Sequence, residues 1–309
     1  MNRRTLLRRG VAAAGVVGTA GCLERVPLLS SENSVTVPDA GDPTYRRWLP
    51  GTDGLESVDG YTVRYESVAD LRGAPRIEAD RDLRRWLVAG RLDRLRKRWD
   101  DFGIGVEDVE DVVRLDGAAD YADPSPRADV VRGSFDPEAV GETLAESDFD
   151  RSGTYRGFRV FRRGSPPRAT GVGEGGVVHV RAEAPEGFLR RIADARRGEA
   201  PRRHETDADF GRLVEGVGQP AVGAVSRRAG ASEPNPDALL FEGGVGVGKA
   251  WFVGDAAVYA RFVLPFGSES AAETDPVREA MTDDDRFDGV EVSRTGRAVF
   301  ADARIDLDS

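Results

Sequence analysis

The sequence is poor in the residue types that most often carry chemistry. Its 309 residues include one cysteine and two histidines, and Lys97 and Lys249 are the only lysines. A single cysteine excludes a disulfide within the chain, so the fold must depend on an ordinary apolar core. The two histidines, His179 and His204, have no spacing that suits zinc. The sequence therefore predicts no metal site and no cofactor.

The nucleophile patterns G-x-S-x-G and S-x-x-K are also absent. Residues 243–249, GGVGVGK, match the start of a phosphate-binding loop, but Ala250 stands where that loop needs Ser or Thr for magnesium. The following residues are strand-like rather than helical, which favours a glycine-rich hairpin. The acids Asp283, Asp284, Asp285 and Asp288 do not have the spacing of a calcium loop, and we expect them to be solvated. No catalytic residue and no ion site is predicted.

No apolar run is long enough for a permanent transmembrane helix, which needs ~20 residues. A short run does lie near the start of the chain, between the pair Arg3 and Arg4 and the lone Cys22. Twin arginines, a short apolar region and small residues before a cysteine are typical of an export signal that ends in a lipobox. We therefore predict that residues 1–22 are the signal and that Cys22 receives a lipid. The expected location is the extracellular face of the cell membrane.

Acids outnumber bases by 54 to 44, and arginine supplies nearly all of the positive charge. A large net charge keeps a protein soluble but adds self-repulsion. Molar salt shortens the screening length to ~3 Å and removes most of that cost. The composition indicates a protein that works in a high-salt medium. Nucleic acid is not an expected partner of an acidic, exported chain.

The chain after the signal is predicted to hold a tether and a folded body. Residues 23–44 are rich in proline and serine, which predicts a flexible tether. The body has room for an α+β domain at 45–230 and a smaller α+β module at 231–309. The exact boundary near 230–240 is not defined by the sequence.

The residue pattern of the body predicts antiparallel strands that alternate with amphipathic helices. Asp136-Pro137 and Asp275-Pro276 each open a helix after a strand, and each helix leads to a pair of strands. A Thr206 cap is expected before an apolar stripe that includes Phe210 and Val217. The order strand, helix, strand, turn, strand therefore occurs twice. We expect α+β, ferredoxin-like modules, duplicated, with helices packed on one face of antiparallel sheets.

Three segments carry a resemblance to a known family. Residues 133–140, GSFDPEAV, 155–158, YRGF, and 207–213, DADFGRL, are similar to uncharacterised twin-arginine-exported lipoproteins of haloarchaea. The resemblance covers most of residues 45–305. It implies an exported, lipid-anchored protein and its fold, but no activity, so no catalytic residue is transferred.

One segment is strongly basic, although the chain as a whole is acidic. Residues 81–98 hold seven arginines and one lysine against two aspartates. The segment is predicted to be helical, and its basic residues either pair with acids of the same chain or form an interaction face. Such a face would meet an acidic protein partner in the envelope or anionic lipid, and high salt favours the protein. The residues expected on this face are Arg84, Arg91, Arg94 and Arg98.

Two classes of function remain open from the sequence. The favoured one is a non-catalytic binding or scaffold module, lipid-anchored through Cys22 at the outer face of the membrane. The alternative is an envelope hydrolase that uses an unrecognised carboxylate-based site. A pocket in which acids with raised pKa values converge would favour the hydrolase.

Overall fold

A computed structural model describes residues 35–52, 61–74, 81–117, 126–227, 235 and 239–307. The predicted export signal with Arg3 and Arg4, and the predicted lipid attachment at Cys22, lie outside the described residues. The described residues belong to one compact unit.

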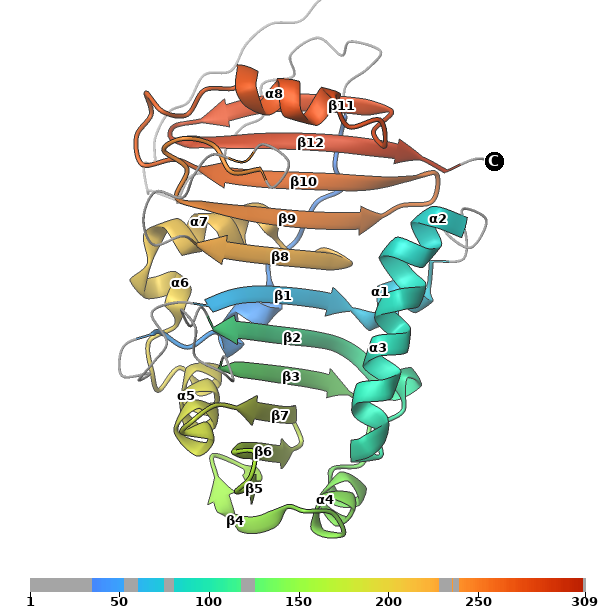
Figure 1. Ribbon diagram of the computed structural model, residues 1–309, viewed down its shortest axis with the longest axis vertical. Helices are drawn as coiled ribbons and strands as arrows, with labels where there is room; N and C mark the ends of the chain where they lie inside the picture. The colour runs from blue at the N-terminus through green and yellow to red at the C-terminus, as the bar shows by residue number, and fades with distance from the viewer. Residues whose placement is uncertain are drawn as a thin grey trace, which may run out of the picture. The chain divides into compact units, whose positions relative to one another are not determined.

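Within the described residues, twelve strands form one antiparallel sheet. Their order across the sheet is β11-β12-β10-β9-β8-β1-β2-β3-β7-β6-β5-β4 (Figure 1). The strands are β1 (Tyr61–Ser67), β2 (Val109–Gly117), β3 (Arg127–Gly133), β4 (Asp150–Tyr155), β5 (Phe158–Arg163), β6 (Arg168–Gly173), β7 (Gly176–Arg181), β8 (Val222–Arg227), β9 (Gly246–Val253), β10 (Ala257–Pro265), β11 (Gly289–Thr295) and β12 (Ala298–Asp306).

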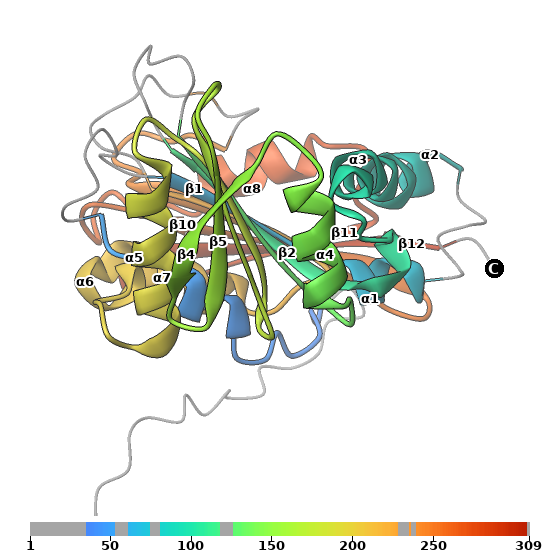
Figure 2. The ribbon, with the colours of Figure 1, turned by 90° about the horizontal axis from the view of Figure 1, so that it is seen from below.

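Helices cover both faces of this sheet (Figure 2). The α-helices are α1 (Val68–Arg72), α2 (Arg81–Arg84), α3 (Gly90–Trp99), α4 (Pro137–Ala145), α5 (Pro185–Arg197), α6 (Arg203–Thr206), α7 (Ala208–Val217) and α8 (Asp275–Thr282). The shorter turns are the 3-10 helices η1 (Thr44–Trp48), η4 (Asp100–Phe102) and η5 (Val106–Asp108), and the π-helix η3 (Arg85–Ala89) joins α2 to α3.

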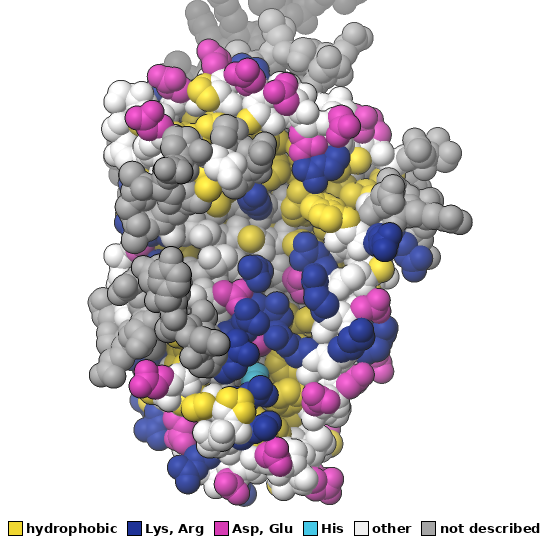
Figure 3. Space-filling view, viewed as in Figure 1, with side chains coloured by type: hydrophobic (Ala, Val, Ile, Leu, Met, Phe, Trp, Pro, Cys, Tyr) yellow, Lys and Arg dark blue, Asp and Glu magenta, His cyan; other side chains and the backbone are white. Residues whose placement is uncertain are grey.

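Strand alternation divides the apolar side chains between two cores. On one face, side chains such as Val63 and Val113 pack against η1, α5 and α7 in a core that includes Trp48 and Phe210. On the opposite face, α8 and the η3 segment cover β8 to β12, while α3 and α4 cover β2 to β7. The middle of this second face, between α3 and α8, carries charged side chains instead of an apolar layer (Figure 3). We call it the open face.

The coarse prediction of an α+β fold with antiparallel strands is confirmed, but two finer predictions are wrong. Helices lie on both faces of the sheet rather than on one. One continuous sheet replaces ferredoxin-like modules. The two segments expected to repeat also differ from each other, because α4 is followed by the four strands β4 to β7 and α8 by β11 and β12. β12 pairs directly with β10, whereas β6 and β7 lie between β5 and β3. Strand order depends on pairing between distant segments, which local periodicity does not encode.

The predicted cap of α4 is confirmed, and the cap expected before the Phe210 stripe is not. Asp136 accepts a hydrogen bond from the amide of Glu138 at 2.8 Å, and Pro137 opens α4 as predicted. The predicted cap at Thr206 is wrong, because the side chain of Asp207 accepts from the amides of Asp209 and Phe210 and so caps α7. Thr206 instead ends α6.

The folded unit starts earlier in the chain than predicted. Val35 and Val37 are buried in the core, so the predicted tether at 23–44 does not extend through these residues. The sheet also continues past 230–240, because β8 pairs with β9 along Val222–Arg227. The predicted modules therefore share one sheet. Among the described residues, no helix combines the length and apolar character that crossing a membrane requires.

Candidate functional site

A row of directly opposed residues crosses the open face. Phe262 on β10 faces Lys249 on β9, which faces Ala224 on β8, and Ala224 faces Arg64 on β1. The side chains of opposed residues point to the same face of a sheet. The row therefore places an aromatic ring and a lysine side by side on the β9–β10 hairpin, with the arginine of the distant strand β1 two positions along.

The glycines of β9 explain why Lys249 points to this face. Gly248 faces α7, and a Cβ atom there would lie 2.7 Å from a methyl group of Val217. Glycine at this position lets the helix approach the strand, and alternation then directs Lys249 and Trp251 to the opposite face. The predicted strand character of this segment is confirmed, because residues 246–253 form β9 in place of the helix that a phosphate-binding loop requires.

Trp86 on η3 forms one wall of a pocket above this row. Its side chain is 44% exposed, and its ring meets Trp251 edge-on at a centroid distance of 4.6 Å. Leu87 and Val88, the next residues, are buried and fix the helix against the sheet. A π-helical turn shifts the side-chain directions of a helix, and such turns are frequent at functional sites.

The segment after α8 forms the facing wall. The Phe287 ring stacks on Trp251 at 6.3 Å and meets Phe262 edge-on at 6.2 Å. Arg286 extends over the rings of Phe287 and Trp86, with its Cζ atom 5.8 and 6.0 Å from their centroids. The Nε of Arg286 donates to Asp284 at 2.8 Å, and a second hydrogen bond joins the same two side chains.

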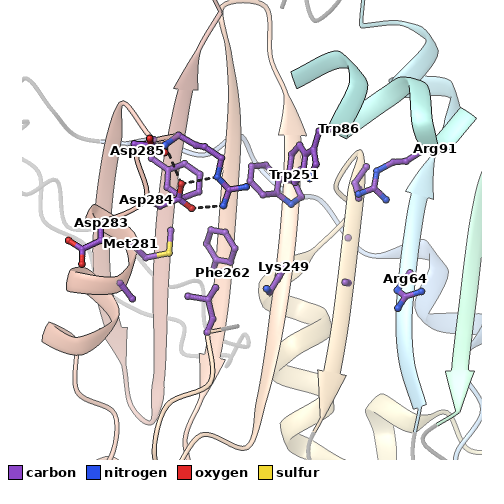
Figure 4. A pocket seen from close by; sticks show the side chains of 17 residues that line it. Arg64, Trp86, Arg91, Lys249, Trp251, Phe262, Met281, Asp283, Asp284 and Asp285 are labelled. Atoms are coloured by element: carbon purple, nitrogen blue, oxygen red, sulfur yellow. Dashed lines mark hydrogen bonds and ion pairs between the residues drawn. The ribbon is translucent and has the colours of Figure 1, made fainter. Parts of the chain in front are cut away.

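These walls enclose a pocket of about 710 Å³, which we call the Trp86–Trp251 pocket (Figure 4). Small residues of β8, Val222 and Ala224, form its floor, and their size makes the hollow. Pockets that bind small molecules have volumes of ~300–1,000 Å³ and combine apolar walls with a few polar groups. The size and lining of this pocket match that description.

Positive charge dominates the side of the pocket toward α3. Arg91 donates to Glu66 at 2.7 Å, and Arg64 forms an ion pair of 2.9 Å with Asp116. The side chain of Lys249 forms no hydrogen bond and no ion pair with any described residue, although it is half-buried. Burial, and then the charge of Arg286, lower the pKa of the Lys249 ammonium from its ordinary value. Lys249 is therefore a cation in a partly aromatic pocket, and its side chain has no partner in the described part of the chain.

The four arginines of the predicted interaction face do not share one environment. Arg91 and Arg98 turn toward the open face, where they pair with Glu66 and with Asp129 at 3.1 Å. Arg84 and Arg94 are exposed on the helix surface. The structure thus brings two of the four predicted arginines to the open face, paired with acids of the same chain.

The acidic residues of the pocket lie on the α8 side. A hydrogen bond from Arg286 lowers the pKa of Asp284, so this carboxyl is ionised in its pair. Asp111, whose pKa is raised by burial, lies instead on the opposite face of the sheet with Arg132. Among the described residues, no group of three or more His, Cys, Asp or Glu side chains could hold a metal ion.

The titration of Lys249 gives a direct test of this electrostatic arrangement. We expect the pH midpoint for acetylation of Lys249 to lie below 10.5, the ordinary value for a lysine, because burial and Arg286 both disfavour the ammonium. The substitution Arg286→Gln removes one of these causes and should therefore raise the pH midpoint for acetylation of Lys249. Peptide mass spectrometry after acetylation over a pH series measures it. A midpoint unchanged by Arg286→Gln would show that the guanidinium does not act on Lys249.

Sequence reasoning missed Trp86, Lys249 and Trp251 as site residues. A partial signal was present, because Lys249 and Trp251 alternate with small residues in 246–253 and must share a strand face. The partners of that face come from β1 and η3, and no local pattern connects them to β9.

Comparison with known proteins identifies a similar fold but indicates no function. No protein-family model and no curated protein matches the chain. A solved structure, crystal form III of TP0453, is similar over 86% of this chain and 94% of its own, with 11% identity and a TM-score of 0.51. Crystal form I of TP0453 covers 87% of this chain and 95% of its own, with 11% identity and a TM-score of 0.48. At this identity the similarity to crystal form III concerns the fold alone.

Proposed function

We propose that this protein is a non-catalytic binding module held at the outer face of the cell membrane by a lipid on Cys22. Its Trp86–Trp251 pocket binds an anionic ligand that has an aromatic or apolar body. The observation that carries this proposal is Lys249, a half-buried cation without a partner among the described residues, set between aromatic walls.

The chemistry of the walls defines the ligand class. Trp251 and Phe262 offer apolar surface, and Trp86 offers an exposed ring on which a flat or apolar group can pack. Lys249 offers a charge-assisted hydrogen bond to an anionic group, and it is paired with none of the described carboxylates. The two features together select an amphiphilic anion.

The proposed high-salt medium is compatible with this mode of binding. Molar salt limits electrostatic attraction between exposed charges to ~3 Å. A pocket that removes the ligand from water protects the ion pair from screening, while apolar contact with its aromatic walls does not depend on charge. Attraction by the exposed arginines of α3 would be weaker under these conditions. An envelope protein partner for Arg84 and Arg94 stays a separate prediction.

The hydrolase alternative has less support. It needs a carboxylic acid with a raised pKa facing a ligand. In this pocket, the hydrogen bond from Arg286 lowers the pKa of Asp284 instead of raising it. Lys249 is suited to bind an anion, and the described residues of the lining include no serine, threonine or cysteine that could act as a nucleophile.

The two lysines provide a matched test of the proposal. In native salt, a water-soluble acetylating ester is applied to the protein in its membranes and to the same protein after unfolding and refolding has removed small molecules. We expect Lys249 to react several times more slowly in the membranes, because the ligand covers it. Lys97 is exposed on α3 and should react equally in both samples.

Measuring how much ligand each variant retains distinguishes binding in the pocket from a general effect of charge. Lys249→Gln should lower the amount of a co-purifying small anion at least tenfold, because a charged hydrogen bond contributes about 1.5–3 kcal/mol. Lys97→Gln should retain it. Native mass spectrometry measures the bound species. Equal acetylation of Lys249 in membranes and after refolding, with no anion bound, would overturn the proposed function.

A further inference from the structure

A second hollow lies on the open face, between the C-terminal end of α3 and the strands β3, β7 and β6. Its volume is about 210 Å³. Its lining consists of Arg98, Asp101, Phe102, Arg127, Asp129, Arg168, His179 and Arg181. We call it the Arg168–Arg181 pocket. It shares no lining residue with the Trp86–Trp251 pocket.

Three arginines stand side by side across this pocket. Arg127 on β3 is directly opposite Arg181 on β7, and Arg181 is directly opposite Arg168 on β6. The Cβ atoms of opposed residues in such pairs are ~4.5–5.5 Å apart, and like charges in this position destabilise a sheet. The fold therefore tolerates a repulsion that an anion would remove.

The protein's own acids relieve only part of this repulsion. Arg127 donates to Asp116 at 2.5 Å, and Arg98 is bound to Asp129. Arg168 and Arg181 pair with no carboxylate among the described residues, and the buried Nε of each lacks a hydrogen-bond partner there. The other acid of the lining, Asp101, is exposed and forms no ion pair with either of these two arginines.

His179 completes the pocket without adding charge. Its Nδ1 lies 2.9 Å from the hydroxyl of Thr170, on the neighbouring strand β6. Burial lowers the pKa of His179 to about 4, so the imidazole is neutral at neutral pH. When Thr170 donates to Nδ1, the ring proton is on Nε2, which can then donate a hydrogen bond to an anion.

We propose that the Arg168–Arg181 pocket binds a tetrahedral oxyanion of the phosphate type, held between the guanidinium groups of Arg168 and Arg181. Guanidinium groups present paired donors that match the oxygens of phosphate. The volume is below the ~300–1,000 Å³ of pockets that take whole ligands, so it fits an anionic group rather than a large molecule. The group is either free phosphate or the phosphate of a monoester.

The test uses the mature protein in buffer of constant potassium chloride and neutral pH. Inorganic phosphate and glycerol phosphate are titrated separately by isothermal calorimetry, and thermal unfolding is followed at each concentration. We expect the wild-type melting temperature to rise with phosphate concentration. Tighter binding of inorganic phosphate indicates the free ion, and tighter binding of glycerol phosphate indicates a monoester.

Two variants and one control separate a site from a general charge effect. Arg168→Gln and Arg181→Gln should each weaken binding by about ten- to a hundredfold. Each should also raise the melting temperature without phosphate, because a repulsion is removed, so loss of binding does not come from unfolding. Arg163→Gln is the control, since Arg163 is opposite Arg168 but pairs with Asp148 at 3.4 Å outside the pocket.

The proposal is overturned if neither anion binds the wild type. It is also overturned if Arg163→Gln weakens binding as much as Arg168→Gln does. Lys249→Gln should leave phosphate binding here unchanged, so this test stands apart from that of the Trp86–Trp251 pocket.

Discussion

Replacing Asp129→Ala is expected to lower the free energy of unfolding by about 3–5 kcal/mol, because it leaves partly buried cations without their carboxylate. The side chain of Asp129 is only 2% exposed. It accepts a hydrogen bond of 2.7 Å from the Nε of Arg114 and bonds of 3.1 Å from Arg98. Once the carboxylate is gone, the two guanidinium groups repel each other in a site that water reaches poorly.

Chemical denaturation in high salt measures this effect. The control is Asp93→Ala, which removes an exposed ion pair with Arg96 on the outer surface of α3. Exposed pairs contribute less than about 1 kcal/mol. Adding Arg114→Leu to Asp129→Ala should restore part of the stability, since the neighbouring charge is then removed. Equal costs for Asp129→Ala and Asp93→Ala would contradict the structural role given to Asp129.

Trp99→Ala is expected to cost about 3–5 kcal/mol, the range for truncating a large buried side chain. Trp99 is fully buried where α3 packs on the sheet, 5.1 Å from Phe102 between ring centroids. The same helix carries Arg91 and Arg98, so loosening it also displaces one wall of the open face. We therefore expect weaker ligand retention in the Trp86–Trp251 pocket together with the lower stability.

Two further substitutions make the expectation specific. Trp99→Phe should cost less than Trp99→Ala, because it keeps most of the ring and removes an indole N–H that has no partner among the described residues. Trp86→Ala should cost only about 0.5–1.5 kcal/mol, the range of one aromatic pair, while still opening the pocket. Thermal unfolding of the three variants orders these costs. A larger loss for Trp86→Ala than for Trp99→Ala would refute the assignment of core and pocket.

Much of the local structure follows from the sequence, because it depends on neighbours along the chain. The helical spacing of Leu95 and Trp99 predicts the buried side of α3, and Asp136-Pro137 predicts the start of α4. Thr206 shows the limit of this reasoning. A threonine and an aspartate next to each other both suit a cap, and only the hydrogen bonds of Asp207 decide between them.

The basic segment 81–98 shows how a correct local prediction can leave function open. Its composition and helical spacing were readable, but the partners of Arg91 and Arg98 were not. Glu66 and Asp129 come from β1 and β3, which are brought to α3 by strand pairing. Whether an arginine is free or paired depends on which acids the fold places within 4 Å of it.

By itself, the sequence determined the elements of this protein: amphipathic helices, alternating strands and a chain without a disulfide. It also carries the predicted export signal and lipid site, which depend on residue order alone. Only the tertiary structure decided that Lys249, Arg64 and Trp86 meet in one pocket, and that Arg168 and Arg181 are neighbours without an ion pair to any described carboxylate. The physical reason is strand register. Side chains become neighbours across a sheet through pairing between distant segments, and a shift of one residue would send each of them to the other face.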